Sequence, residues 1–343
     1  ASALNNDIPY NQFVVQQIAG DLMEKEKQPI ATGFFVVGPT YQSDGGDPEA
    51  KAAAKAETLS DRIDTFSRAF LGLTAACARC HDHKFDPISI EDYYALAGIF
   101  NNTKNTDSNV GTKIEIDAYQ ASQKSISDQN KSINSYLDSE SKRLSTNRKE
   151  IEKNLPEEST AKLVEMRAEL EKLKTQLPPK PATAHVLSDS GNADIHVAIR
   201  GDLRRKGKKV PRRFLEIISG KKAKPYTKGS GRLQLAQSVT APDNPLTARV
   251  IVNRVWGWHF GDALVRTPSN FGIIGEKPSH PELLDWLAAD LVENGWSLKQ
   301  LHRKILLSST WQMSSAYDHE KFTLDGDNRL LWRASPRKLE VEA

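Results

Sequence analysis

The feature that most constrains this fold is a long segment, residues 117–177, whose composition differs from that of the rest of the chain. It is rich in Ser, Lys and Glu and contains no Trp, Phe, Cys or Gly. Its apolar residues recur at steps of seven or of three and four, the spacing of a helix that buries one narrow stripe. These residues are Ile126, Ile133, Leu137, Leu144, Ile151, Leu163, Met166, Leu170, Leu173 and Leu177.

Pro156 divides this segment, because a proline removes a backbone donor and clashes with the preceding helical turn. We therefore expect one helix over 117–154 and another over 157–177, packed as an antiparallel coiled-coil hairpin that projects as an arm. The prolines between 178 and 181 stiffen the exit from the arm and mark a domain boundary. We interpret the arm as a structural spacer, and the alternative is a surface that docks a partner protein.

Composition places the chain among folded proteins of about two domains. It has 343 residues, 38% hydrophobic and 27% charged, with a mean hydropathy of −0.54. No apolar run reaches the roughly 18 residues that a membrane-spanning helix needs, so we expect no membrane span. The 47 basic and 44 acidic residues leave a net charge of +3, which argues against a nucleic-acid partner. The basic residues between Arg204 and Arg213 we interpret as a solvated loop, with an anion or polymer site as the alternative.

Outside the arm the pattern is mainly helical. Apolar residues from Leu59 to Leu73 recur at steps of four and three, which predicts an amphipathic helix running into the cysteines. The segment 41–57 before it contains Gly and Pro and indicates a mobile connection. Ser89 followed by Asp92 predicts a capped helix start. Short β-branched or alternating stretches predict a small β element at 184–187, 195–200 and 210–214.

These patterns predict a mainly α fold with a minor β element. We expect two helical domains, residues 1–116 and 181–343, with the hairpin inserted at 117–180. The chain begins at Ala1 without an initiator Met and ends, at residues 339–343, on a helix-like pattern without a stop signal. We therefore expect a fragment, truncated at the C-terminus.

The only two cysteines lie three residues apart, in the sequence Cys77-Ala78-Arg79-Cys80-His81. This C-x-x-C-H spacing is typical of c-type haem attachment, in which two thiols bond one porphyrin edge and the following His binds iron. We therefore predict haem c at Cys77 and Cys80, with His81 as the proximal ligand. With haem bound, Arg79 and Lys84 would pair with the propionates, and the alternative is that both are solvated surface residues. Because such attachment occurs outside the cytoplasm, the motif also predicts an exported, periplasmic or cell-envelope protein with an electron-transfer role and a redox partner.

Two alternatives use the same atoms. In the first, Cys77 and Cys80 join His81 or His83, with Asp82 and Asp86 nearby, in a zinc or iron site. Because the string around them is longer than haem attachment requires, a calcium ion bound by its carboxylates is a further form of this alternative. In the second, the cysteines form a disulfide or a redox pair. Either alternative would make the chain a structural or binding module.

A sixth haem ligand is not evident, because no Met follows the motif until Met166. His83 is too near His81 to reach the opposite face of the ring. If none of the candidates binds, the iron has an open position, which favours small-molecule chemistry over simple electron transfer. The candidates are Met23, Met166, Met313, His185, His196, His259, His280, His302 and His319.

The sequence around the cysteines resembles the planctomycete cytochrome-associated domain of unknown function. The matching strings are FLGLT at 70–74, CARCHDHKFDPI at 77–88 and DYYAL at 92–96. The last third resembles its usual partner, the planctomycete-specific domain, in SGRL at 230–233, DNPLTARV at 243–250, PSNFG at 268–272 and PSHPELLDWLA at 278–288. The resemblance covers residues 1 to about 103 and about 190 to 343, and the arm is a variable insert.

This resemblance implies an exported protein that is often accompanied by a separate cytochrome c domain, which this chain lacks. It carries over no catalytic role, only the cysteine motif as a haem site. A hydrolase that uses His280 with Asp285, or His302, is a third hypothesis. The absence of a nucleophile elbow, phosphate loop or metalloprotease motif argues against it. Whether the chain is an enzyme is left open.

Overall fold

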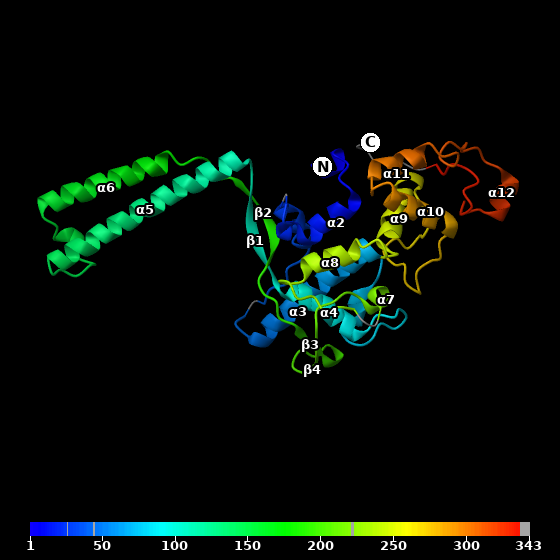
Figure 1. Ribbon diagram of the computed structural model, residues 1–343, viewed down its shortest axis with the longest axis horizontal. Coiled ribbons are helices and arrows are strands. Elements are labelled where there is room, and N and C mark those ends of the chain that lie inside the picture. Colours follow the sequence, from blue (N-terminus) through cyan, green and yellow to red (C-terminus); the bar gives the residue numbers. More distant parts are fainter. Residues whose placement is uncertain (26, 44, 221–222, 337–343) are drawn as a thin grey trace. The chain divides into compact units, whose positions relative to one another are not determined.

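The computed structural model describes residues 1–25, 27–43, 45–220 and 223–336, and in them the fold is mainly helical with two small antiparallel sheets (Figure 1). The expected fold class is confirmed at this level. The helix-like pattern at 339–343 lies outside the described residues. The α-helices are α1 (Ser2–Asn5), α2 (Tyr10–Ala19), α3 (Pro48–Phe66), α4 (Ile90–Asn101), α5 (Lys113–Arg143), α6 (Glu157–Thr175), α7 (Glu216–Ser219), α8 (Arg232–Val239), α9 (Thr247–Phe260), α10 (Pro281–Glu293), α11 (Leu298–Leu306) and α12 (His319–Leu324).

The strands are β1 (Thr103–Val110), β2 (Ala182–Asp189), β3 (Ile195–Ala198) and β4 (Lys206–Val210), paired as β1 with β2 and β3 with β4. In the second sheet Ile195 lies opposite Val210. The third expected strand therefore covers 206–210 rather than 210–214. Short turns of other helix types are η1 (Gly20–Leu22), η2 (Pro29–Phe35), η3 (Ser67–Leu71), η4 (Ala75–Arg79), η5 (Ile151–Lys153) and η6 (Ile199–Gly201).

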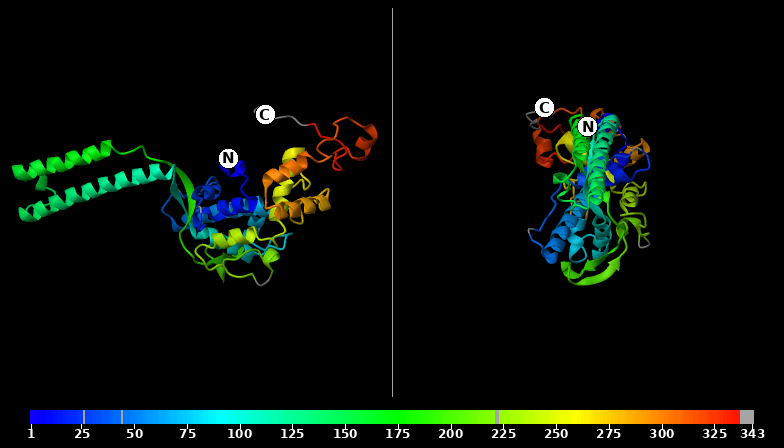
Figure 2. Two further views of the ribbon diagram at one scale, coloured as in Figure 1. Left: turned by 45° about the horizontal axis from the view of Figure 1, so that its top comes forward. Right: turned by 90° about the vertical axis from the view of Figure 1, so that its left-hand side faces the viewer.

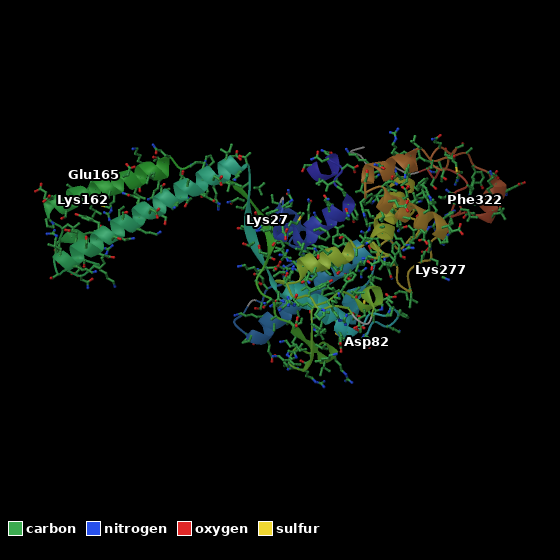
Figure 3. All side chains as sticks on the ribbon, in the orientation of Figure 1. Lys27, Asp82, Lys162, Glu165, Lys277 and Phe322 are labelled. Atoms are coloured by element: carbon green, nitrogen blue, oxygen red, sulfur yellow. The ribbon has the colours of Figure 1, made fainter. Side chains whose placement is uncertain are left out.

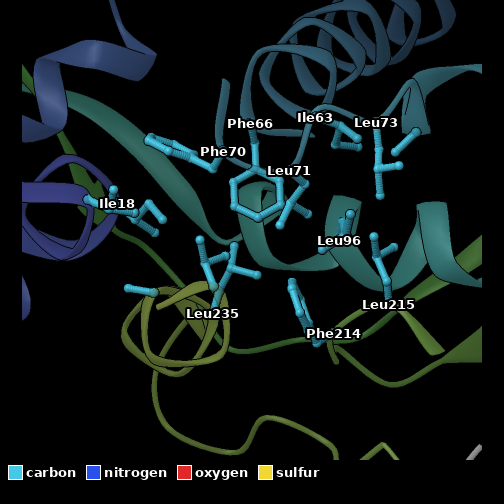
Figure 4. Close-up of a cluster of buried hydrophobic side chains, with 14 of the residues drawn as sticks. Ile18, Ile63, Phe66, Phe70, Leu71, Leu73, Leu96, Phe214, Leu215 and Leu235 are labelled. Carbon is cyan, nitrogen blue, oxygen red and sulfur yellow. The ribbon is translucent and has the colours of Figure 1, made fainter. Parts of the chain in front are cut away.

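The chain divides into two compact units, which we describe separately. Unit 1 comprises Ala1–Thr106 and the chain from His185 onward, and unit 2 comprises Asp107–Ala184. The core of unit 1 joins the amphipathic face of α3 to α4, α2, α8 and residues 214–215. Figure 4 shows Ile63, Phe66 and Leu71 facing Leu96, Leu235 and Phe214, all of them buried. Residues that precede unit 2 in the chain and residues that follow it thus share one core.

Two expectations about α3 are wrong. The segment 41–57 is not simply a mobile connection, because α3 begins at Pro48, where the Asp47 carboxylate caps the first backbone N–H groups and proline occupies the first turn. The helix also ends before the cysteines. A π-helical turn, η3, follows α3, and Gly72 ends it with a left-handed φ of 60°. Cys77 therefore lies in a separate turn, η4. The predicted capping box at Ser89 and Asp92 is present and starts α4.

The basic residues near 204–213 are not all solvated. Arg212 is buried and pairs with Asp194 at 2.9 Å, and Arg213 is buried against Asp92 at 2.5 Å. The other basic residues of this segment are exposed or nearly so. The loop interpretation therefore fails for these two arginines, which anchor the β3–β4 segment to its neighbours.

Unit 2 consists mainly of α5 and α6, which lie side by side in Figure 1 and in the left view of Figure 2. Their facing stripes bury Ile133, Leu137, Leu163 and Leu170, together with Ile151 of η5. The first helix is shorter than the expected 117–154, because Ser145 adopts a left-handed φ of 50° just after Arg143. The helix expected at 157–177 is α6.

No helix in the described ranges is long and apolar enough to cross a bilayer, as the composition predicts.

Candidate functional site

The two cysteines and His81 lie on the exposed side of η4 and the residues that follow it. Cys77 and Cys80 are free thiols at the surface, and His81 is exposed as well. Ala75 and Ala78 of the same turn are completely buried, and the Cys77 backbone N–H donates to the Thr74 carbonyl at 3.2 Å. The small alanines thus anchor the turn to the core and direct the reactive groups outward.

The His81 ring is oriented by its own backbone neighbour. Its Nδ1 lies 2.7 Å from the carbonyl oxygen of Asp82, which accepts, so Nδ1 carries the proton and Nε2 carries the lone pair. Within the described residues Nε2 has no hydrogen-bond partner. A histidine that ligates a metal is held by this kind of contact on its second ring nitrogen. His81 therefore presents Nε2 at the surface, in the same short string as the two exposed thiols.

Gly201 approaches Cys80 so closely that only glycine fits there. A Cβ added at Gly201 would lie 2.6 Å from the Cys80 Sγ, and the residue has a left-handed φ of 78°. The turn between β3 and β4 therefore covers one side of this thiol. Sequence reasoning missed Gly201, because nothing local to it indicates a partner so distant in the chain.

The two predicted cationic residues differ in their surroundings. Arg79 is half-buried and pairs with Glu57 of α3 at 2.8 Å. Burial lowers the pKa of Arg79, but its hydrogen bond to the Glu57 carboxylate and the nearby Tyr93 outweigh burial, so the pKa is raised overall. Lys84 is exposed, with its ammonium 5.2 Å from the centre of the Phe85 ring. Arg79 is thus held in place by a carboxylate, whereas Lys84 extends over an aromatic face.

His83 and Asp86 are buried in the second half of the motif. The His83 Nε2 lies 3.0 Å from the Thr74 Oγ1, and its Nδ1 accepts from the Asp86 backbone N–H at 2.8 Å. The Asp86 Oδ1 accepts from the Ile273 backbone N–H at 2.7 Å. Asp82, labelled in Figure 3, is exposed, and its Oδ1 accepts from the Ile90 N–H at the start of α4.

The alternative metal set is not gathered at one point. In the described part of the chain, no three His, Cys, Asp or Glu side chains converge in a way that could hold a metal ion. The cysteines face outward, whereas His83 and Asp86 face the protein interior. His83 and Asp86 are therefore buried structural residues, whereas the cysteines and His81 are exposed. The sequence alone did not distinguish these two groups.

Two family models match the chain. Residues 1–105 match PSCyt2, described as a protein of unknown function (DUF1549), and residues 231–343 match PSD1, described as a protein of unknown function (DUF1553). The chain combines a PSCyt2 region with a PSD1 region. This is the domain order that the motif strings suggest, although the PSD1 match begins at 231 rather than near 190. Searches of the curated proteins and of the solved structures returned no match.

The PSCyt2 and PSD1 regions fold together. Asp86 of PSCyt2 bonds to Ile273 of PSD1, and the Phe271 N–H of PSD1 donates to the Gly72 carbonyl at 2.7 Å. Arg232 of PSD1 is completely buried against Asp21 of PSCyt2. The cysteine turn therefore sits in a frame to which both regions contribute.

Five candidate sixth ligands in unit 1 make hydrogen bonds through one ring nitrogen. His259 and His302 bond to each other, with Nε2 and Nδ1 2.7 Å apart. The other three bond locally: His196 Nδ1 to the Gly207 carbonyl, His280 Nδ1 to the Ser279 Oγ, and His319 Nδ1 to the Tyr317 hydroxyl. Only His196 among these shares a surface with a motif residue: it lines, with Arg79, a cavity of about 380 Å³.

The hydrolase hypothesis gains no support from the geometry. Asp285 pairs with Arg249 at 2.6 Å, and His280 bonds to Ser279. The described contacts therefore do not join His280 to Asp285 as an orienting carboxylate would be joined to a catalytic base.

Proposed function

We propose that Cys77, Cys80 and His81 form an attachment site for a c-type haem, and that the chain is an exported electron-transfer protein within a larger assembly. The observation that supports this proposal is the exposure of all three groups on η4 and the two residues after it, where Ala75 and Ala78 are buried. Two accessible thiols and an accessible imidazole at this spacing are the groups that attachment requires.

Cys77, Cys80 and His81 have the chemistry needed to hold a haem by one edge of its porphyrin. Each thiol would add across one vinyl double bond, so that S–H and C=C become C–S and C–H and nothing leaves. His81 would bind through Nε2, since Nδ1 is held by the Asp82 carbonyl. Gly201 lets the β3–β4 turn approach one side of the Cys80 sulfur, and the thiol remains exposed. The bound group would supply a one-electron iron couple.

Export follows from the same proposal, because thioether attachment takes place outside the cytoplasm. The partner would then be a redox protein or a further cytochrome domain. Arg79 is the last residue of η4, and its ion pair with Glu57 holds its positive charge next to the motif. A propionate of the haem would pair with this charge.

The deciding experiment is an absorption spectrum, oxidised and dithionite-reduced, with a pyridine haemochrome assay. The protein should be made in a host that matures c-type cytochromes. We expect a covalent haem signal that is lost in Cys77→Ala and Cys80→Ala, and a changed spectrum in His81→Ala. Lys277→Ala, which alters an exposed residue outside the motif that is not a candidate ligand, is the control and should keep the spectrum. A folded, colourless wild-type protein would refute the proposal.

A reversible Cys77–Cys80 disulfide is the second candidate, favoured by the exposure of both thiols. Thiol titration before and after reduction would show two thiols appearing. A zinc, iron or calcium site at these residues is less favoured, since the described residues bring no third ligand to the cysteines. Elemental analysis of the colourless protein would separate these two outcomes.

For the arm, we propose that α5 and α6 form an antiparallel coiled coil acting as a structural spacer. The apolar stripe that packs them has the seven-residue spacing of such a structure. Docking of a partner through its outer faces is the alternative, and a deletion of the arm that leaves partner binding intact would argue against it.

A further inference from the structure

Arg62 of α3 is a buried cation whose hydrogen-bond partners are all neutral. The residue is only 6% exposed. Its NH1 donates to the Thr103 Oγ1 at 3.1 Å and its NH2 to the Asn105 Oδ1 at 2.6 Å. Its Nε is buried without a hydrogen-bond partner in the described residues. Since buried charges are normally paired with an opposite charge, this guanidinium is unusual.

The contrast with Arg232 shows what a satisfied buried arginine looks like in the same unit. Arg232 is completely buried and contacts Asp21 and Asp189, each at 2.7 Å. Arg62 makes no such ion pair in the described structure. Burial lowers the pKa of Arg62, and the more distant Asp61 acts in the opposite direction. The positive charge of Arg62 is therefore only partly compensated.

Arg62 lines a cavity whose other charged walls are also positive. The cavity has a volume of about 520 Å³ and lies between α3, the segment 40–43 and the start of β1, all within unit 1. Lys51, Lys55 and Lys104 line it as well, and all three are exposed. Among the described lining residues there is no Asp or Glu.

The remaining walls suit a small polar ligand. Hydroxyl groups line the cavity from Thr40, Tyr41, Ser43, Thr58 and Thr103, and Leu59 and Phe100 contribute apolar surface. The volume lies within the range of about 300–1,000 Å³ that is usual for small-molecule sites. Hydroxyls and cations together match the acceptor oxygens of an anion.

We propose that this cavity binds a small ligand through an oxyanion group, a sulfate, phosphate or carboxylate, held by Arg62 and the three lysines. The anion supplies the countercharge that the protein does not place beside Arg62. This site is separate from the cysteine turn and does not depend on the proposed haem.

The test is calorimetric titration of the full chain with sodium sulfate, sodium phosphate and sodium acetate, at ionic strength matched with sodium chloride. Arg62→Met removes the charge and keeps much of the side-chain length. The triple variant Lys51→Ala, Lys55→Ala, Lys104→Ala alters only exposed residues. Lys277→Ala, at an exposed position labelled in Figure 3 and outside the cavity, is the matched control.

We expect saturable binding of at least one of the three anions, weakened about tenfold or more in Arg62→Met and weakened in the triple variant. Lys277→Ala should bind as the wild type does. If circular dichroism shows that Arg62→Met does not fold, the triple variant decides. Absence of saturable binding by all three anions would overturn the proposal, and so would equal binding in the wild type and the triple variant.

Discussion

The carboxylate of Asp86 accepts a hydrogen bond from the backbone N–H of Ile273 at 2.7 Å, joining the end of the PSCyt2 motif to a loop of PSD1. Gly272 permits this contact. A Cβ at Gly272 would lie 2.3 to 2.6 Å from atoms of the Asp86 carboxylate. Asp86 is 4% exposed, and its Oδ1 accepts the Ile273 bond, so a shift of the carboxylate away from an added Cβ would lengthen that bond. The position of the Asp86 carboxylate in the PSCyt2 region therefore requires a glycine at position 272 of the PSD1 region.

Gly272→Ala is expected to destabilise unit 1 by about 1–3 kcal/mol, the usual cost of overpacking a buried site. The added methyl group would displace the Asp86 carboxylate and lengthen its bond to Ile273. Urea unfolding monitored by tryptophan fluorescence measures the change. Gly46→Ala is the control, because an added Cβ there meets no atom within 4 Å. Equal stability of the two variants would contradict the close contact.

Local patterns predicted the helices well where periodicity and capping agreed. The apolar face that includes Leu59 and Phe66 is buried, and Ser89 caps α4 as its spacing with Asp92 indicates. The start of α3 was missed although its signal was present, since Asp47 followed by Pro48 is a strong helix start. Gly45, Gly46 and Pro48 in the same stretch are also typical of a loop, so composition alone does not reveal this helix start.

The sequence predicts only those residues of the candidate site that are neighbours in the chain. The exposed thiols and His81 come from one short string. By contrast, the contacts of Cys80 with Gly201 and of Asp86 with Ile273 join residues far apart in the chain, and no periodicity encodes them. The same holds for Arg62, whose lack of a charged partner follows from what the fold places around it.

Arg232→Met should cost more stability than Arg62→Met. Replacing Arg232 leaves the carboxylates of Asp21 and Asp189 without their cation, and breaking a buried pair in this way costs about 3–5 kcal/mol. Replacing Arg62 leaves only neutral groups behind. Urea unfolding of both variants, in buffer without multivalent anions, compares them directly. A larger loss in Arg62→Met would show that Arg62 has a charged partner in the folded protein.

Stability should fall as pH falls through the range in which His302 titrates. Burial lowers the pKa of His302 below its ordinary value of 6.5, with Asp7 opposing it, and its Nδ1 bonds to His259. Below pH 6.5 the unfolded chain therefore binds a proton that the folded chain resists, so the free energy of unfolding decreases until the folded pKa is passed. His302→Gln should reduce this slope.

The pH effect is measured by urea unfolding of the wild type and His302→Gln at several values between about pH 5 and 8. The variant loses the bond to His259 at every pH, so the slope, not the absolute stability, is the readout. The pKa of Asp7 is lowered from 3.8, which places its titration below this range. Identical slopes in the two proteins would exclude His302 as the source.

Leu137→Ala is expected to destabilise unit 2 without affecting unit 1. Leu137 is 2% exposed and packs in the cluster between α5 and α6, where a Leu→Ala change costs about 2–5 kcal/mol. All six Trp residues lie outside residues 107–184. Tryptophan fluorescence therefore reports unit 1, whereas far-ultraviolet circular dichroism reports the helices of both units.

We expect an earlier transition in the dichroism of Leu137→Ala and an unchanged fluorescence transition. Val164→Ala, at a position on α6 that is 61% exposed, should alter neither. An equal shift in both signals would mean that the units unfold as one, and unchanged dichroism would mean that the stripe through Leu137 does not hold the arm together. Because the arm has its own apolar cluster, separate from the core of unit 1, independent unfolding is the outcome that its packing favours.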